Sequence, residues 1–261
     1  MNPALRTAAS GMRAQQITID VIANNLANVN TTGFKRSRAS FEDVLYETVQ
    51  GPRVPNAEGE AIGPMQVGRG TRLAAITRIH TQGAAELTGR PLDLAIDGDG
   101  FFQVQLPDGR IGYTRDGSFT LSESGTLVTN GGYALLPGIT IPPEVTTVTI
   151  APSGAVTAQV GKAGETIELG RIELARFMNP SGLLSLGENL YVETAASGQP
   201  IVGFPQEEGF GRILQGTLEA SNVEIVQEMV DMIAAQRAYE VNGRVIRAGE
   251  DMMRVLHDAM R

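Results

Sequence analysis

Apolar residues near the start of the chain recur every seven positions, a pattern typical of a helix with a narrow apolar seam. Pro3 suits the first turn of such a helix, where its missing N–H costs nothing. The asparagines and glycine of residues 28–33 accept the left-handed backbone that ends a helix. We therefore predict an N-terminal helical segment, residues 1–33. Its apolar positions are Leu5, Met12, Ile19, Leu26 and, on the neighbouring row, Ile22.

The end of the chain shows the same period. Ser221 and Glu224 have the spacing of a capping box, and no proline follows them. The uninterrupted helix would be about 55 Å long. Its apolar stripe is wide enough for more than one neighbour, and Gly243 and Gly249 allow another helix to approach closely. The heptad positions of this segment, residues 216–261, are Ile225, Met232, Tyr239, Ile246 and Met253.

Between the helices the pattern changes to short apolar runs separated by turn residues. Turn sequences such as Pro107-Asp108-Gly109 and Asn130-Gly131-Gly132 are typical of β-hairpins. Residues 80–215 are therefore predicted to form an all-β domain. The runs that we expect to be strands include residues 92–96, 101–106, 145–150, 155–160 and 171–177.

Residues 34–79 are predicted to form an extended connecting arm. The stretch 50–70 is rich in glycine and proline and has few large apolar residues, so it cannot pack a core by itself and should be extended or mobile. Taken together, the segments predict an α+β fold. In it the N- and C-terminal heptad helices pair as a coiled coil, and the all-β domain is inserted between them.

Composition lowers the expectation of an enzyme. The 261 residues include 31 glycines and 13 prolines but no cysteine, and the only two histidines are His80 and His257. These counts exclude disulfides, a thiol nucleophile and cysteine-based or multi-histidine metal sites. The missing thiols are compatible with an oxidising compartment. We expect no catalytic activity, no cofactor and no metal.

Charge is distributed unevenly along the chain. The net charge is +4 for residues 1–40, −10 for residues 41–220 and −2 for the remainder. An acidic body without a basic stripe argues against nucleic acid and anionic membranes as partners. No apolar run is long enough to span a membrane, and the first twenty residues lack the apolar core of a cleaved signal peptide. The distribution favours a soluble protein that binds other proteins.

Several short motifs suggest chemistry but have simpler explanations. Asp97-Gly98-Asp99-Gly100 resembles the start of a calcium loop, yet the next ligand position is Phe101, so a turn is favoured. Gly68-Arg69-Gly70 lacks the strand and helix of a nucleotide-binding loop. The acidic pairs Glu207-Glu208 and Glu250-Asp251 are interpreted as solvated charge. Arg115 and Asp116 are expected to form a structural ion pair in a turn.

Residues 24–36, NNLANVNTTGFKR, resemble the N-terminal signature of bacterial flagellar rod and hook proteins. The resemblance continues through FEDVLY at residues 41–46, GDGFFQV at 98–104, YTRDGSF at 113–119 and QRAYE at 236–240, and so covers nearly the whole chain. Within this family, the length of the chain and its Gly/Pro-rich arm are most similar to those of the distal-rod proteins. The resemblance adds Asn25, Asn28, Gly33 and Phe34 to the residues expected to serve self-assembly.

The resemblance implies a structural role. Such a subunit would be exported without a cleaved signal through the flagellar export apparatus and would polymerise with copies of itself at the tip of the growing axis, under a rod cap. Its terminal helices would form the inner tube of a rigid rod that crosses the periplasm and transmits torque from motor to hook. The implied partners also include proximal rod proteins, the hook protein and the flagellar L and P ring proteins. Direct insertion into a membrane is not expected.

Other assignments remain open from the sequence alone. The chain could be a proximal rod or hook subunit of the same family. A secreted β-rich binding protein would explain the turns but not the second long heptad helix. A hydrolase that uses aspartate and glutamate would need a cleft with close carboxylates, which no motif indicates.

Overall fold

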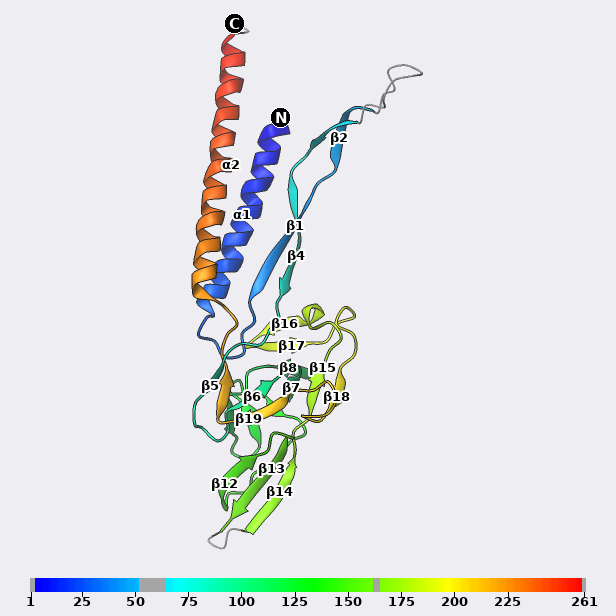
Figure 1. Cartoon of the computed structure of the whole chain (residues 1–261), viewed down its shortest axis with the longest axis vertical. Coiled ribbons are helices and arrows are strands. Elements are labelled where there is room, and N and C mark those ends of the chain that lie inside the picture. The colour runs from blue at the N-terminus through cyan, green and yellow to red at the C-terminus, as the bar shows by residue number, and fades with distance from the viewer. Residues whose placement is uncertain (1–2, 52–63, 162–164, 260–261) are drawn as a thin grey trace. The chain divides into compact units, whose positions relative to one another are not determined.

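The computed structural model describes residues 3–51, 64–161 and 165–259 (Figure 1). The chain forms two compact units, and neither is continuous in sequence. The helical unit combines both termini with the segment Ser37–Thr77. The β-rich unit combines Asn28–Arg36 with Arg78–Val223. The fold is α+β, as the sequence predicts.

Two long helices dominate the helical unit. Helix α1 covers Pro3–Ala27 and helix α2 covers Ile225–Ala259, so both predicted helices are confirmed. They run side by side in opposite directions (Figure 1). Helix α2 begins later than the capping box predicts, and the Ser221 hydroxyl instead accepts a hydrogen bond from the Val223 N–H at 3.3 Å.

The connecting arm contains strands. Strand β1 (Ser37–Asp43) pairs with β4 (Thr71–Arg78), and β2 (Tyr46–Gln50) pairs antiparallel with β3 (Met65–Gly68). Part of the Gly/Pro-rich stretch therefore belongs to a regular ribbon. Residues 52–63, the rest of the predicted arm, lie outside the described residues.

The β-rich unit is built on a nine-stranded sheet with the order β16-β17-β8-β7-β11-β10-β9, to which β15 and β18 add at β7. A three-stranded sheet, β12-β13-β14, and the pairs β19-β6 and β20-β5 complete it. The strands are β5 (Ala85–Leu87), β6 (Leu94–Asp97), β7 (Phe101–Gln105), β8 (Ile111–Thr114), β9 (Phe119–Leu121), β10 (Leu127–Thr129), β11 (Ala134–Leu135), β12 (Val145–Ile150), β13 (Ala155–Val160), β14 (Glu165–Arg171), β15 (Leu174–Arg176), β16 (Leu184–Gly187), β17 (Leu190–Val192), β18 (Ile201–Gly203), β19 (Arg212–Gln215) and β20 (Thr217–Glu219), with a short 3-10 helix at Pro180–Gly182.

The predicted strands and turns agree well with these elements. Strands β12 and β13 have the predicted bounds, and the turn glycine Gly109 adopts the left-handed backbone with φ +82°. The β-rich unit extends past residue 215 because β20 pairs with β5. Residues 217–219 are therefore a strand, although the sequence places them in the C-terminal helical segment.

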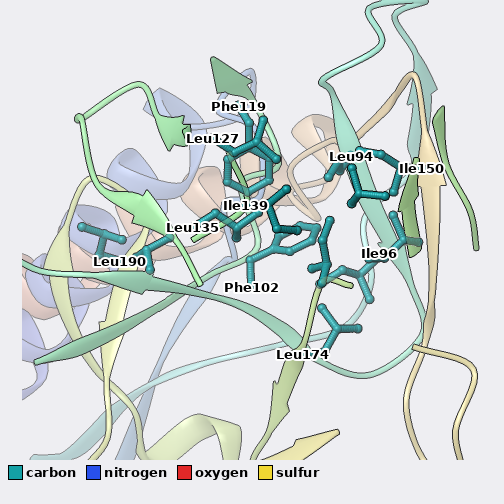
Figure 2. Packing of buried hydrophobic residues seen from close by; sticks show 14 of the residues in the cluster. Leu94, Ile96, Phe102, Phe119, Leu127, Leu135, Ile139, Ile150, Leu174 and Leu190 are labelled. Carbon is teal, nitrogen blue, oxygen red and sulfur yellow. The ribbon is translucent and has the colours of Figure 1, made fainter. Parts of the chain in front are cut away.

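The core of the β-rich unit is mainly aliphatic (Figure 2). Phe102 and Phe119 are fully buried at its centre, with their rings 5.2 Å apart and nearly perpendicular. Such edge-to-face contacts suit the charge distribution of aromatic rings. A second, smaller cluster surrounds Tyr113 and Tyr191. The scarcity of aromatic residues is thus offset by close packing of leucine, isoleucine and valine.

Gly33 is required by its surroundings. Its φ is +68°, and a Cβ there would lie 2.7 Å from backbone atoms of Arg115 and Asp116. We expect Gly33→Ala to destabilise the β-rich unit by about 3 kcal/mol, since neither backbone can move aside cheaply. Gly132→Ala is the control, because Gly132 has φ +83° with no atom within 4 Å of the added Cβ. It should lose about 1 kcal/mol in the same thermal melt, and equal losses would contradict the steric argument.

Candidate assembly site

The two helices approach closely where small residues lie between them. A Cβ on Gly249 would lie 2.6 Å from Cδ2 of Leu5, and a Cβ on Gly11 would lie 3.0 Å from the Asn242 amide. Since Leu5 is near the start of α1 and Gly249 is near the end of α2, these contacts fix an antiparallel register. The close approach expected from Gly243 and Gly249 is confirmed at Gly249.

A polar anchor lies at the other end of the helix pair. Asn25, only 1% exposed, donates a hydrogen bond from its amide to the Glu228 carboxylate at 3.1 Å. The same side chain accepts from the Ser37 N–H and donates to the Ser37 carbonyl, both at 2.9 Å. Asn25 therefore ties α1, α2 and β1 together. Its place in the family signature has this structural explanation within one chain.

The side of α2 that faces α1 contains mostly small or polar residues. Glu228, Ala235 and Gly249 are buried there, and Asn242 is half-buried. The five predicted heptad positions of α2 do not share one level of burial. Met232 and Ile246 are half-buried, whereas the other three positions remain 41–48% exposed; these are Ile225, Tyr239 and Met253.

Large apolar residues form a second stripe on α2, which we call the outer stripe. Its members follow one another at intervals of three, four, seven or eight residues, which places them on one side of a helix. They are 45–71% exposed. Their positions along the helix are offset by about half a turn from those of Glu228, Ala235 and Gly249. The stripe therefore lies on the side of α2 opposite the side that contacts α1. The outer stripe consists of Val226, Val230, Ile233, Val241, Val245, Met252 and Val255.

Helix α1 uses most of its predicted apolar positions inside the helical unit. Ile22 is 5% exposed, and the remaining four, Leu5, Met12, Ile19 and Leu26, are half-buried. Apart from Asn25 and Ile22, the most completely buried residues of α1 are the small Ala8 and Ala14. Four of the five predicted apolar positions are thus less buried than these alanines.

The remaining signature residues belong to the β-rich unit. Asn28 accepts a hydrogen bond from the Thr31 hydroxyl at 3.2 Å in the turn after α1, and Phe34 is 5% exposed. The Gly33 N–H donates to the Glu219 carbonyl at 2.8 Å. The sequence assigns these three residues to self-assembly, whereas in the structure each has contacts within its own unit.

A buried charge cluster follows the signature. Lys35 is fully buried and donates from Nζ to Oε1 of Glu219 and, at 2.8 Å, to the Thr81 carbonyl. Arg115 Nη1 lies 3.3 Å from Oε2 of the same carboxylate. Burial lowers the pKa values of Lys35 and Arg115, and the attraction of Glu219 opposes this shift. One carboxylate therefore holds two buried cations.

This cluster corrects the expected pairing of Arg115. Asp116 does not bind it; instead its carboxylate accepts hydrogen bonds from the N–H and hydroxyl of Ser118, at 3.0 and 2.7 Å. Arg115 binds Glu219, which lies 104 residues away in sequence. Local spacing suggests Asp116 because it is adjacent, but the turn at Asp116 satisfies that carboxylate by itself.

His80 lies beside the charge cluster, between the rings of Phe101 and Tyr191 at 5.6 and 5.5 Å. Burial, together with the positive charges of Lys35 and Arg115, lowers its pKa to about 4. An unfolded histidine titrates near 6.5, so the unfolded chain binds more protons between these pH values. His80 therefore contributes stability above pH 6.5 that is lost as the pH falls towards 4.

We expect this loss to reach about 3 kcal/mol, since each unit of pKa difference is worth about 1.4 kcal/mol. Urea unfolding of wild type and His80→Phe between pH 4 and 7 would measure it. Phenylalanine keeps an aromatic ring beside Phe101 and Tyr191 but cannot be protonated. The wild type should weaken relative to the variant as the pH falls, and parallel pH profiles would contradict the assignment.

The other motifs remain structural. Asp97 is the last residue of β6 and pairs with Arg212 at 2.8 Å, and Gly98 and Asp99 form a bend after the strand. Among the described residues, no group of three or more histidine, aspartate or glutamate side chains is arranged to hold a metal ion. Within the same residues, neither helix is both long and apolar enough to cross a bilayer.

The sequence analysis did not identify two residues, Glu219 and Asn222, that connect separate segments of the β-rich unit. Glu219 binds Lys35, Arg115 and the Gly83 N–H. The Asn222 amide donates to the carbonyls of Ile79 and Thr81, and its oxygen accepts from the Arg36 N–H. The available signal in the sequence was Glu219, a charged residue in a short run just before the C-terminal helix.

Three family models match the chain at its ends and in its middle. Their descriptions are flagella basal body rod protein for residues 5–35, flagellar hook protein FlgE/F/G D1 domain for residues 95–158, and flagellar basal body rod FlgEFG protein C-terminal for residues 214–258. The matched segments contain α1 with its signature, the core strands β6 and β7, and nearly all of α2. The chain belongs to the family of flagellar hook and basal-body rod proteins.

Full-length relatives narrow this family to the FlgG rod proteins. The chain is 50% identical to the flagellar basal-body rod protein FlgG of Borreliella burgdorferi, over the full length of both chains. It is 47% identical to FlgG of Caulobacter vibrioides over 96% of both chains, but 38% identical to FlgF of the same organism over 92% of this chain and 90% of that one. The chain is a structural subunit of the flagellar distal rod, and the resemblance found in its sequence is confirmed.

Proposed function

We propose that the chain self-assembles into a helical tube through the outer stripe of α2. A helix at the surface of a monomer normally turns one apolar face towards its own domain and a polar face towards water. Helix α2 instead contacts α1 through mostly small or polar residues and exposes large apolar residues on its opposite side. This exposed second stripe is the observation that carries the proposal, because burying it requires another chain.

In this proposal α1 and α2 form an antiparallel coiled coil, and neighbouring copies cover their outer surfaces. The interface is heterologous, because the stripe of one copy contacts a different surface of the next, and repetition of such a contact generates a helical polymer. The two-stranded ribbon β2–β3 also exposes apolar side chains, including Val49, Met65 and Val67. A ribbon of two strands gains stability by packing on another surface, which supports a stiffening role for the arm between subunits.

Membership of the rod family supports the finer functional assignments of this proposal. The assembled tube transmits torque from motor to hook across the periplasm, after export of each subunit without a cleaved signal peptide. Its neighbours are other copies, proximal rod proteins and the hook protein, with the L and P rings around the tube and a rod cap at the growing end. The exposed assembly surface of α2 is consistent with these roles.

Truncation after Val223 tests whether α2 is the assembly element. The β-rich unit ends at Val223, so this truncation removes α2 and keeps every residue of that unit. We expect the truncated chain to keep the thermal transition of that unit. Cells that carry it in place of the full chain should make basal bodies that end at a short proximal rod and should not swim.

Electron microscopy of isolated basal bodies would measure this outcome. Restoring the full chain should restore full-length rods. Removal of only the residues after Ala259 is the control for a disturbed C-terminus, and it should leave rods intact. Full-length rods built from the chain truncated at Val223 would contradict the proposal.

A further inference from the structure

A groove lies between α1 and β4 in the helical unit. Its volume is about 470 Å³, and its walls are formed by one face of α1 and by the start of β4. The lining residues are Ala9, Ser10, Arg13, Ala14 and Ile17 of α1 and Thr71, Arg72 and Leu73 of β4. The floor is therefore small and largely apolar, and two arginines lie on it or at its rim.

The groove is held in shape by a specific contact. Ser10 donates from Oγ to the Thr7 carbonyl at 2.7 Å and accepts from the Thr71 N–H at 3.2 Å. Gly70, with φ +115°, makes this approach possible, because a Cβ there would lie 2.2 Å from Ser10 Oγ. The start of β4 is thus fixed against α1, and the groove is a built feature of the unit.

We infer that this groove binds the first turns of α2 from a second copy of the chain, an inference that rests on the proposed polymer and names its receiving surface. These turns expose Val226, Val230 and Ile233, at 71%, 56% and 56%. Alanines on the groove floor leave room for such branched side chains. An intermolecular contact would bury apolar surface on both partners.

Charge selects these turns over the rest of the outer stripe. The groove contributes Arg13 and Arg72, of which Arg72 pairs with Glu42 at 2.6 Å, and α1 has no carboxylate before Asp20. Residues 224–236 include three carboxylates and no cation; Glu228 is buried against α1, whereas Glu224 and Asp231 are exposed. Further along, residues 237–259 carry four arginines and four carboxylates, so their charges balance. The first turns therefore attract the groove more strongly than the later turns do.

Engineered cysteines can test the contact directly, because the natural chain has none. Leu73→Cys places a thiol in the groove, and Ile233→Cys places one on the first turns of α2. Within one chain these positions cannot join, since Ile233 lies on the side of α2 away from α1 and a helix is about 10 Å across, whereas a disulfide needs Cβ atoms about 4 Å apart. Any disulfide between them must link two copies.

We expect rods purified from cells with both cysteines to give a ladder of linked chains on oxidation, visible on a non-reducing gel. Each single-cysteine variant is a control, and so is the pair Leu73→Cys with Val255→Cys, which uses the far end of the stripe. None of these should give the ladder. Rods that assemble without linkage at 73–233, or that link at 73–255 instead, would overturn the inference while leaving the proposed polymer intact.

If the double-cysteine chain does not assemble, exchanging the charges of Arg13 and Asp231 tests the contact between the groove and α2. Arg13→Asp and Asp231→Arg should each lower the yield of rods about ten-fold, because each places like charges in contact. The two substitutions together should restore most of the yield. Failure of the double variant to recover any rods would overturn the inference.

Discussion

Replacing Glu219 by alanine is expected to destabilise the β-rich unit by about 3–5 kcal/mol, because it removes the carboxylate that pairs with the two buried cations Lys35 and Arg115. Glu219 is 2% exposed, and Lys35 and Arg115 are 0% and 5% exposed. Neither cation could reach water without opening the core. The Gly83 N–H would lose its acceptor as well.

Thermal and urea unfolding of the purified chain would measure the loss. The control is Asp108→Ala, which breaks the exposed Asp108–Arg110 ion pair, with 2.6 Å between Oδ2 and Nε. Exposed pairs contribute less than about 1 kcal/mol, so the control should melt close to wild type. A double-mutant cycle with Lys35→Met and Glu219→Gln would give the coupling energy of the buried pair. Similar losses of unfolding free energy for Glu219→Ala and for the control would show that the charge cluster does not stabilise the β-rich unit.

The sequence predicts local features of this fold because they depend on near neighbours. The period of Leu5, Met12 and Ile19 and the absence of internal proline specify α1, and turn glycines such as Gly109 separate the strands. The Glu219 cluster is different. Lys35, Arg115 and Glu219 are brought together by three separate segments of the fold, and no spacing in the sequence reports such a meeting.

The second large effect is expected at the outer stripe. Val230→Asp should abolish rod formation and motility while leaving the stability of the monomer within about 0.5 kcal/mol of wild type. Val230 is 56% exposed in the single chain, so a carboxylate there remains hydrated. In the polymer the same carboxylate would lose its water against the apolar floor of the groove, where Arg13 already faces Asp231, at a cost of several kcal/mol per contact.

Gln236→Asp is the matched control. It adds the same charge to an exposed position of α2 outside the outer stripe. Rods should form with this variant, as judged by electron microscopy of basal bodies and by swimming in soft agar. If Val230→Asp still builds rods, or if its monomer melts far below the control, the outer stripe is not an assembly surface.

The candidate site was only partly predictable for a related reason. Helix α2 has apolar residues on so many positions that the seven-residue period selects Tyr239 and Met253 together with Met232 and Ile246. The structure separates them: Met232 and Ile246 are half-buried, and Tyr239 and Met253 stay exposed. Which side meets α1 depends on the small residues Ala235 and Gly249. The glycine indicates a close approach, but a hydrophobicity pattern gives neither residue enough weight to identify the contact side.

The pairing of Asn25 with Glu228 also has a consequence for when the chain can fold. These residues are 203 positions apart, so the helical unit has a very high contact order, and its completion waits for the last segment to be made. Closing so long a loop carries an entropic cost that grows with the logarithm of its length. A nascent chain that lacks α2 therefore cannot complete the helical unit. Only a finished polypeptide can present Arg13 and Val230 in their final register, which delays polymerisation until synthesis ends.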